Sequence, residues 1–167
     1  MDIIKSIKQD LARQRAKLME GVGVDGYDFK TTKNRLGWVE YSFNLFDPES
    51  ENDTGKGSVS FTREHSGDPD EGQQQHPLRQ WEIEFEIQDS RLGKDPAKAM
   101  SDPYYITTIA SIIHVFMKHE PNAEVVYYDN TSNASMKKIN SSLSKAGINV
   151  SGIRQKKYHG SYFFTIN

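Results

Sequence analysis

The chain has 167 residues, which is enough for one domain with a hydrophobic core and too few for two ordinary domains. Its net charge of −2 excludes a general attraction to nucleic acid or to a membrane surface. The absence of cysteine excludes disulfides, thiolate metal sites and a cysteine nucleophile, and it fits a reducing compartment.

Residues 1–26 predict an N-terminal amphipathic helix and a glycine-rich connector, ahead of a single domain over residues 27–167. From Asp2 to about Glu20, apolar residues recur at helical spacing, at Ile4, Ile7, Leu11 and Leu18 with Ile3 beside them. The stretch GVGVDG then ends the helix. Because no long apolar run begins the chain or follows later, we expect neither a signal peptide nor a membrane span, and a soluble intracellular protein.

Three strands are predicted next. In WVEYSFNLF, which begins at Trp38, apolar and polar residues alternate, and SVSFT, which begins at Ser58, repeats the alternation as a hairpin partner. Two polar stretches, Asp47 to Gly57 and Arg63 to Pro77, are predicted as loops. The second is long for a compact domain, so we expect it to be mobile or functional.

The clearest strand is WEIEFEIQ, from Trp81 to Gln88. Its apolar residues face one way, and Glu82, Glu84 and Glu86 face the other. An antiparallel sheet with one solvated face produces this pattern. Alternating glutamates of this kind most often only form the solvated face of a sheet and have no catalytic role.

The second half of the chain alternates helices and strands. A helix begins at Pro103 with Asp102 or Ser101 as its cap, and Glu120-Pro121 stops it. The stretch AEVVYY is a buried strand, and a third helix ends at Gly147. A final hairpin closes the order α-β-β-β-α-β-α-β-β, which predicts an α+β fold with a mixed, mostly antiparallel sheet and helices on both faces.

This order resembles the GNAT acyltransferase fold with its first strand missing. WEIEFEIQ resembles the family's central strand, PYYITTIASIIHVFMKH the helix after it, AEVVYY the next strand and ASMKKINSSLSKAGI the following helix. In the family this last helix commonly has an asparagine near its start and a glycine with an apolar residue at its end, and the residues here that resemble them are Asn130 or Asn133, Gly147 and Ile148. The C-terminal part is also similar to small uncharacterised phage-encoded proteins. The resemblance covers about half to two thirds of the chain, and its motifs are short.

The resemblance implies a site for acetyl-CoA between the central strand and the next helix. The family's loop has Arg or Gln, two residues, Gly, one residue and then Gly or Ala, and it holds the pyrophosphate with backbone amides. The candidate cofactor-binding residues here are Arg91, Gly93, Lys94 and Ser101. Ser90 replaces the Arg or Gln, and Asp95 replaces the second small residue.

The catalytic residues of the family are matched less well. Many members place a tyrosine one turn before the closing glycine to protonate the leaving thiolate, and this chain has Leu143 there. A general base would come from Glu82, Glu84 or Glu86. These departures favour a domain that keeps the fold without the chemistry.

Two other possible sites, one for a metal and one for nucleic acid, have simpler explanations. His65 and His76 flank an acidic stretch, but its glycines and glutamines do not suit a rigid metal site, so we expect no metal. The tail RQKKYHGSYFF mixes cations with aromatic residues, which suits nucleic acid through Arg154, Lys156 and Lys157. Lysines that protect a hairpin edge explain the same pattern.

The sequence therefore predicts a non-catalytic, degenerate GNAT-like domain of phage type that acts through protein contacts. Its partner would be a virion protein, a host factor or a second copy of the chain, in the host-cell cytoplasm or in the virion, and not a membrane. An acetyl-CoA-dependent N-acyltransferase is the alternative, and a nucleic-acid-binding accessory protein is the second alternative.

Overall fold

The computed structural model covers the whole chain. The description below is restricted to residues 3–4, 6–8, 26–47, 52–66, 76–88, 90, 92–129, 133–155 and 162–167. Residues 21–25 of the predicted glycine-rich connector lie outside these residues, as do Arg91, Asn130, Lys156 and Lys157. The division of the chain at residue 26 stays a prediction.

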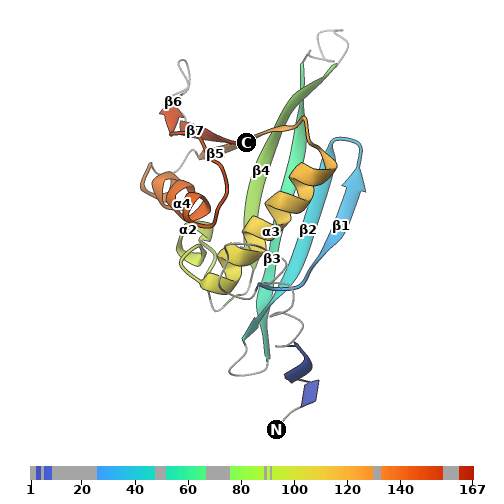
Figure 1. The fold of residues 1–167 in the computed structure, drawn as a ribbon, viewed down its shortest axis with the longest axis vertical. Helices are drawn as coiled ribbons and strands as arrows, with labels where there is room; N and C mark the ends of the chain where they lie inside the picture. Colours follow the sequence, from blue (N-terminus) through green and yellow to red (C-terminus); the bar gives the residue numbers. More distant parts are fainter. Residues whose placement is uncertain are drawn as a thin grey trace.

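The described elements form an α+β fold, as predicted, around one seven-stranded sheet with the order β1-β2-β3-β4-β5-β7-β6 (Figure 1). All neighbouring strands are antiparallel except β4 and β5, which are parallel. The strands are β1 (Phe29–Arg35), β2 (Trp38–Asp47), β3 (Asn52–Ser66), β4 (His76–Gln88), β5 (Glu124–Asp129), β6 (Arg154–Gln155) and β7 (Tyr162–Ile166). The helices with described bounds are α2 (Pro96–Ala99), α3 (Pro103–His119) and α4 (Asn133–Lys145).

Strand β1 was not predicted from the sequence. It pairs with β2 through a hairpin at Leu36 and Gly37, and Gly37 has a φ of 79°, which glycine adopts without strain. β1 lies at the edge of the sheet, so only β2 pairs with it.

The predicted loops are shorter in the structure. Strand β3 begins at Asn52 and continues to Ser66, and β4 begins at His76, so both ends of the predicted loop from Arg63 to Pro77 are paired strand. The reason is that strand pairing satisfies backbone groups whatever the side chains are, and polar residues in a strand leave no alternation to detect. Residues 67–75, at the centre of that loop, lie outside the description.

The core lies between the sheet and α3. The Phe61 and Phe116 rings stack with centroids 3.8 Å apart, and Trp81 meets Phe116 edge-on at 5.2 Å. The buried side chains of α4 belong to the same core cluster, with Met136, Ile139 and Leu143 all at most 2% exposed. The structure thus confirms that this C-terminal helix packs against the sheet.

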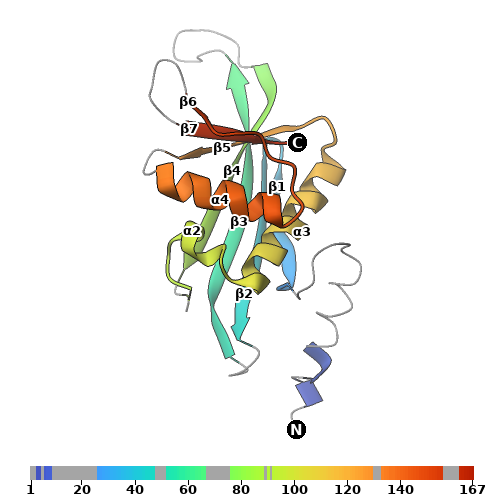
Figure 2. The ribbon, with the colours of Figure 1, turned by 60° about the vertical axis from the view of Figure 1, so that its left-hand side comes forward.

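Helices α2, α3 and α4 cover the same face of the sheet (Figures 1 and 2). The expectation of helices on both faces is therefore wrong for the described part of the chain. The physical reason is visible in β2, β3 and β4, because apart from Trp38 at the start of β2 their described residues on the other face are polar or charged and leave little apolar surface for a second helix layer to bury. We call this other side the helix-free face. No described helix is both long and apolar enough to cross a membrane.

Candidate functional site

The three glutamates predicted as base candidates lie on the helix-free face of β4. Glu84 and Glu86 are exposed, and Glu82 is half-buried. Their neighbours on β3 are Thr62, Ser60 and Ser58, in register order. This environment is polar and open, so the glutamates do not share a closed reaction site.

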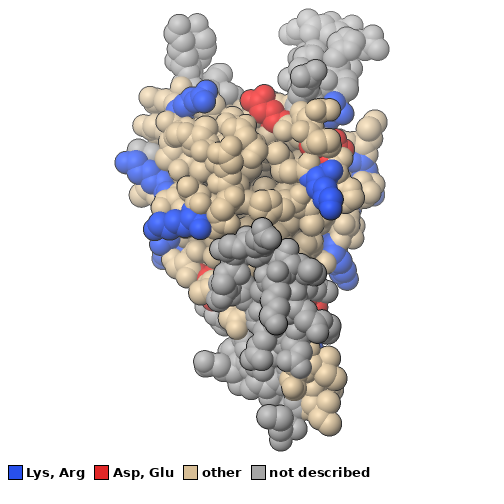
Figure 3. Space-filling view, viewed as in Figure 1, with Lys and Arg blue, Asp and Glu red and all other residues tan. Residues whose placement is uncertain are grey.

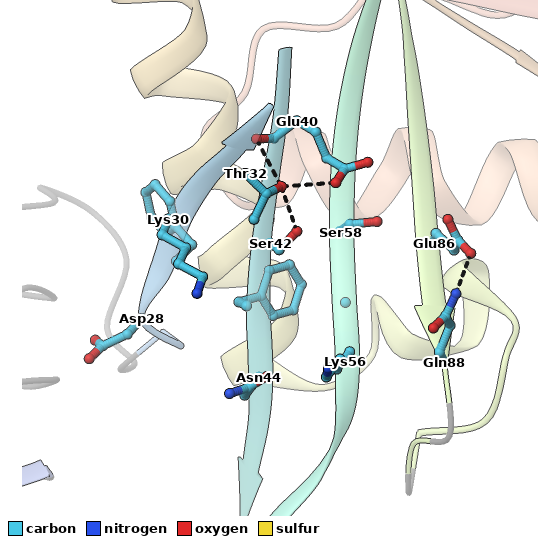
Figure 4. Close-up of a pocket in the computed structure, with 13 residues that line it drawn as sticks. Asp28, Lys30, Thr32, Glu40, Ser42, Asn44, Lys56, Ser58, Glu86 and Gln88 are labelled. Carbon is cyan, nitrogen blue, oxygen red and sulfur yellow. Dashed lines mark hydrogen bonds between the residues drawn. The ribbon is translucent and has the colours of Figure 1, made fainter. Parts of the chain in front are cut away.

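A hollow of about 690 Å³ lies on the helix-free face across β1 to β4 (Figure 4). Of the three predicted glutamates, only Glu86 lines it. The other charged side chains come from the residue before β1 and from three strands: Asp28, Lys30 of β1, Glu40 of β2 and Lys56 of β3. Sequence analysis missed these four residues, because their proximity depends on the pairing of β1, β2 and β3.

Two carboxylates of this hollow, those of Glu40 and Glu86, accept hydrogen bonds from neighbouring side chains. The Thr32 hydroxyl donates to Oε1 of Glu40 at 2.8 Å and lies 2.9 Å from the Ser42 hydroxyl. The register of β1 shifts between Thr31 and Lys33, and this irregularity places Thr32 above the two β2 residues. Opposite them, the Gln88 amide donates to Oε1 of Glu86 at 2.7 Å (Figure 4).

The lysines of the hollow are less constrained. Lys30 and Lys56 are exposed, and neither ammonium group has a hydrogen bond or ion pair within the described part of the chain. Lys33, by contrast, lies over the Trp38 ring, 3.9 Å from its centroid, outside the hollow. The hollow therefore offers two ammonium groups, oriented carboxylates and the Ser42 and Ser58 hydroxyls to a polar ligand or protein surface.

Metal binding is not indicated in the described residues. No group of three or more His, Asp or Glu side chains among them could hold a metal ion. In the pairing of β3 with β4, His65 lies opposite Pro77 and His76 lies opposite Ser66, so the two histidines are not directly opposite each other.

The predicted cofactor loop follows β4. Gly93 lies in a turn in which its N–H donates to the Ser90 carbonyl at 3.0 Å, and the Leu92 N–H donates to the Ser90 hydroxyl at 2.9 Å. Gly93 and Lys94 are exposed next to the start of α2, and Ser101 is exposed between α2 and α3. Arg91 lies outside the described residues, so its place beside them stays a prediction.

Both helix N-termini after β4 are capped by aspartates. Oδ1 of Asp95 accepts a hydrogen bond from the Ala97 N–H at 3.0 Å, and Oδ2 of Asp102 accepts one from the Tyr105 N–H at 3.0 Å. Pro96 and Pro103 occupy the first turns and have no N–H to donate. The chain's own carboxylates therefore stand where amides would otherwise face an anion.

Strands β4 and β5 separate soon after they meet. They pair only from Gln80 to Glu82 and from Glu124 to Val126, and beyond this point the Phe85 and Tyr127 rings lie 5.4 Å apart. The buried Tyr105 hydroxyl has no hydrogen-bond partner in the described structure. Burial, with a smaller contribution from nearby Tyr127, raises the Tyr105 pKa well above its usual value.

The remaining predicted residues divide between core and surface. Leu143 is fully buried, and the helix closes at Gly147 with the Ile148 N–H bound to the Leu143 carbonyl at 3.0 Å, so this stretch acts in packing. Arg154 is exposed on β6, at the edge of the sheet. Lys156 and Lys157 lie outside the described residues, so the predicted basic site is only partly visible.

Comparisons with known proteins give little further information. No family model matches the chain, and no curated protein does. A crystal structure of a "putative acetyltransferase" from Sphaerobacter thermophilus DSM 20745 is similar over 94% of this chain and 86% of that chain, with 7% sequence identity and a TM-score of 0.35. This similarity is too low to extend an activity to the chain.

Proposed function

We propose that the chain is a non-catalytic, degenerate GNAT-like domain that acts by binding another protein. The observation that carries the proposal is the pair of aspartate caps after β4. A bound pyrophosphate needs free backbone N–H groups at a helix N-terminus, and here Asp95 and Asp102 each already accept from one of those groups, the Ala97 N–H and the Tyr105 N–H. A second anion beside each carboxylate would be repelled.

The helix-free face supplies the contact surface of this proposal. Its hollow combines the ammonium groups of Lys30 and Lys56 with the carboxylates of Glu40 and Glu86 on the face of the sheet that no described helix covers. A protein surface with charges of both signs complements such a mixture. By the resemblance to phage-encoded proteins, that partner is a virion protein or a host factor, encountered in the virion or in the host-cell cytoplasm.

A thermal-shift measurement with acetyl-CoA tests the absence of cofactor binding. A ligand at 100 times its dissociation constant would add about 2.7 kcal/mol to the unfolding free energy, which raises the melting temperature by roughly 5–11 °C in a domain of this size. We expect no shift at millimolar acetyl-CoA. A shift that disappears when Arg91 and Lys94 are changed to Glu would refute the proposal.

Charge reversal in the hollow tests the protein contact. Partners captured from a lysate of the organism that carries the chain are identified by mass spectrometry, purified and titrated against the chain. We expect the Lys30→Glu, Lys56→Glu double variant to weaken this binding at least tenfold, since two attractive charges become repulsive. Lys98→Glu, an exposed change on α2, is the matched control. Equal weakening by the control would place the contact elsewhere.

One observation favours N-acyl transfer as a second candidate function. The pairing of β4 and β5 ends at Glu82 and Val126, and the half-buried Tyr127 lies just beyond this point, where its ring is 5.4 Å from that of Phe85. A ligand that entered between the two strands would meet this tyrosine, and a tyrosine hydroxyl can act as a general acid. Acetyl transfer from acetyl-CoA that is lost in Tyr127→Phe would establish this function.

A further inference from the structure

The three helices that cover the sheet carry lysines and no acidic residue. No aspartate or glutamate occurs in PAKA, PYYITTIASIIHVFMKH or NASMKKINSSLSK, the segments of α2, α3 and α4. In the whole chain, by contrast, acidic residues outnumber basic ones by 23 to 21. The carboxylates next to these helices in the sequence lie at helix ends, in the caps Asp95, Asp102 and Glu120. The view toward the helices accordingly shows few acidic side chains (Figure 3).

The lysines are densest on the exposed side of α4. Lys137, Lys138 and Lys145 are exposed, and Ser141 and Ser144 are exposed between them. Residues three, four or seven positions apart lie on the same side of a helix, so these five side chains form one stripe. We call it the basic stripe. The opposite side of α4 is buried against the sheet, so the basic stripe is the surface that this helix presents to other molecules.

The groups of the basic stripe suit a partner with many phosphates. None of its three lysines has an ion pair within the described part of the chain. A helix face that only keeps a protein soluble normally mixes charges of both signs, whereas this face has one sign. The stripe spans about 12 Å along the helix axis at about 1.5 Å per residue, and a nucleic-acid duplex carries one negative charge per about 1.7 Å. Each ammonium group can therefore reach a phosphate of its own.

The composition of α4 favours a duplex over a single strand. Proteins that bind single strands stack the bases on aromatic side chains, and α4 has no aromatic residue. Base edges are read mainly by arginine, asparagine and glutamine. The helix has no arginine or glutamine, Asn133 begins it, and the Asn140 amide already donates to the Ser151 carbonyl at 2.9 Å. Lysine and serine contacts to phosphates position a protein on a duplex without selecting a base sequence.

We propose that the basic stripe of α4 binds the phosphate backbone of double-stranded nucleic acid, whatever its base sequence. The inference goes beyond the proposed function, because the stripe lies on the helix-covered side and the hollow lies on the other side of the sheet. It also concerns residues other than the predicted basic tail at Arg154, Lys156 and Lys157. Sequence-independent binding of this kind has dissociation constants of about 10⁻⁴–10⁻⁶ M at physiological salt.

A titration of labelled duplex DNA with the full chain tests the proposal by fluorescence anisotropy. Three phosphate contacts, at about −0.9 each, should give a slope of about −2.7 in a plot of log K against log salt concentration between about 50 and 200 mM. The Lys137→Gln, Lys138→Gln, Lys145→Gln variant should bind at least tenfold more weakly at the lowest salt and lose most of this slope. Glutamine and lysine have similar helix propensities, and the melting temperature reports whether the variant is folded.

A matched control separates the stripe from the charge of the whole chain. Lys33→Gln, Arg35→Gln, Lys118→Gln removes the same charge from β1 and from the last turn of α3, and it should bind like the parent. Arginine at all three stripe positions keeps the charge and should keep the binding. A parent that does not bind duplex DNA at the lowest salt, or equal weakening by the stripe variant and the control, would overturn the proposal. Tighter binding to a single strand of the same length, or to vesicles of anionic lipid, would also overturn it.

Discussion

The two faces of the sheet differ sharply although the same strands form both. On the helix-covered face, Phe43, Phe61 and Ile83 are at most 3% exposed and pack under α3. On the helix-free face, the residues that alternate with the buried ones along the strands include Asn44, Glu84 and Glu86, which are all exposed. One face therefore holds the fold together, and the other keeps its polar groups available for contacts.

The distribution of charge follows the same division. The view toward the helices shows Lys and Arg scattered around a mostly uncharged surface with few acidic residues (Figure 3). The carboxylates of β4 point away from that side, onto the helix-free face. Because charged groups on the solvated side contribute little to stability, substitutions on the two faces should have very different costs.

The largest effect is expected for Phe61→Ala. The side chain is fully buried and stacks on Phe116, so its removal leaves a cavity in the core. The variant should lose about 3–5 kcal/mol of unfolding free energy and roughly 6–20 °C of melting temperature. Ser60→Ala, on the other face of the same strand, is the control and should stay within about 0.5 kcal/mol of the parent in chemical denaturation. Equal losses of unfolding free energy in the two variants would show that the two faces contribute equally to stability.

Gly57→Ala should have the next largest effect, because it overfills the covered face. Gly57 lies opposite Phe43 in the register of β2 and β3, and a Cβ atom there would overlap the Phe43 ring. Forcing that buried ring aside should cost about 1–3 kcal/mol, measured by urea denaturation. Gly152→Ala adds a Cβ with no neighbour within 4 Å and serves as the control. An unfolding free energy of Gly57→Ala equal to that of the parent would show that the Phe43 ring can shift without cost.

Alkaline pH should destabilise the covered face through its tyrosines. Burial, with a smaller contribution from Tyr127, raises the pKa of Tyr105, and burial with a smaller contribution from Glu120 raises the pKa of Tyr41. A raised folded-state pKa gives stability that is complete below the unfolded pKa of about 10 and is lost as the pH rises toward the folded value. Tyr105 should therefore remove up to about 1.4 kcal/mol of unfolding free energy per pH unit above pH 10, and Tyr41 should add a smaller effect of the same sign.

Tyr105→Phe separates this effect from general alkaline unfolding. The Tyr105 hydroxyl has no partner in the described structure, so its removal should leave the stability at neutral pH unchanged or slightly higher. Above about pH 10 the variant should lose stability less steeply than the parent. A loss of stability at neutral pH would instead indicate a hydrogen bond to this hydroxyl.

The loss of a helix cap should be smaller again. Asp102→Ala removes the acceptor for the Tyr105 N–H and should cost about 0.5–2 kcal/mol, because α3 keeps its packing on the sheet. Asp102→Asn keeps a capping side chain without the charge and is the control. A thermal shift by acetyl-CoA in Asp102→Asn or Asp102→Ala that the parent lacks would show that the Asp102 carboxylate excludes the cofactor.

Much of the covered face could be predicted from the sequence, since burial on one side imposes strict alternation. WEIEFEIQ was identified as a strand for this reason, and α3 begins after Asp102 and ends before Glu120, as predicted. Strand β1 was missed because FKTTKNR is mostly polar at the sheet edge, where pairing with β2 and not apolar burial fixes the strand. The second helix layer was predicted from the order of the elements, and the mostly polar residues on the helix-free face of β2, β3 and β4 do not support it.

The site on the helix-free face was much less predictable. Of the five charged residues that line the hollow, the sequence singled out Glu86, and it offered Glu82 and Glu84 beside it. Lys30, Glu40 and Lys56 lie on three strands, and only the strand register brings them together. Register depends on contacts across the whole sheet, and one sequence shows alternation along a strand without showing which residues lie opposite.

The smallest effect is expected for Glu84→Gln, at the centre of the helix-free face. The side chain is exposed, and its neighbour across β3 is Ser60, which is neutral. Its charge is therefore screened by water, and the unfolding free energy should change by less than about 0.5 kcal/mol. The control is the conservative Glu84→Asp. Acetyl transfer by the parent that falls about 10²–10⁴-fold in Glu84→Gln, without a change in folding, would make Glu84 a general base and the helix-free face a catalytic surface. If the parent and Glu84→Gln are equally stable and neither transfers acetyl groups, the helix-free face remains a contact surface. The covered face would then differ from it in stability, because the loss of one buried ring there destabilises the fold.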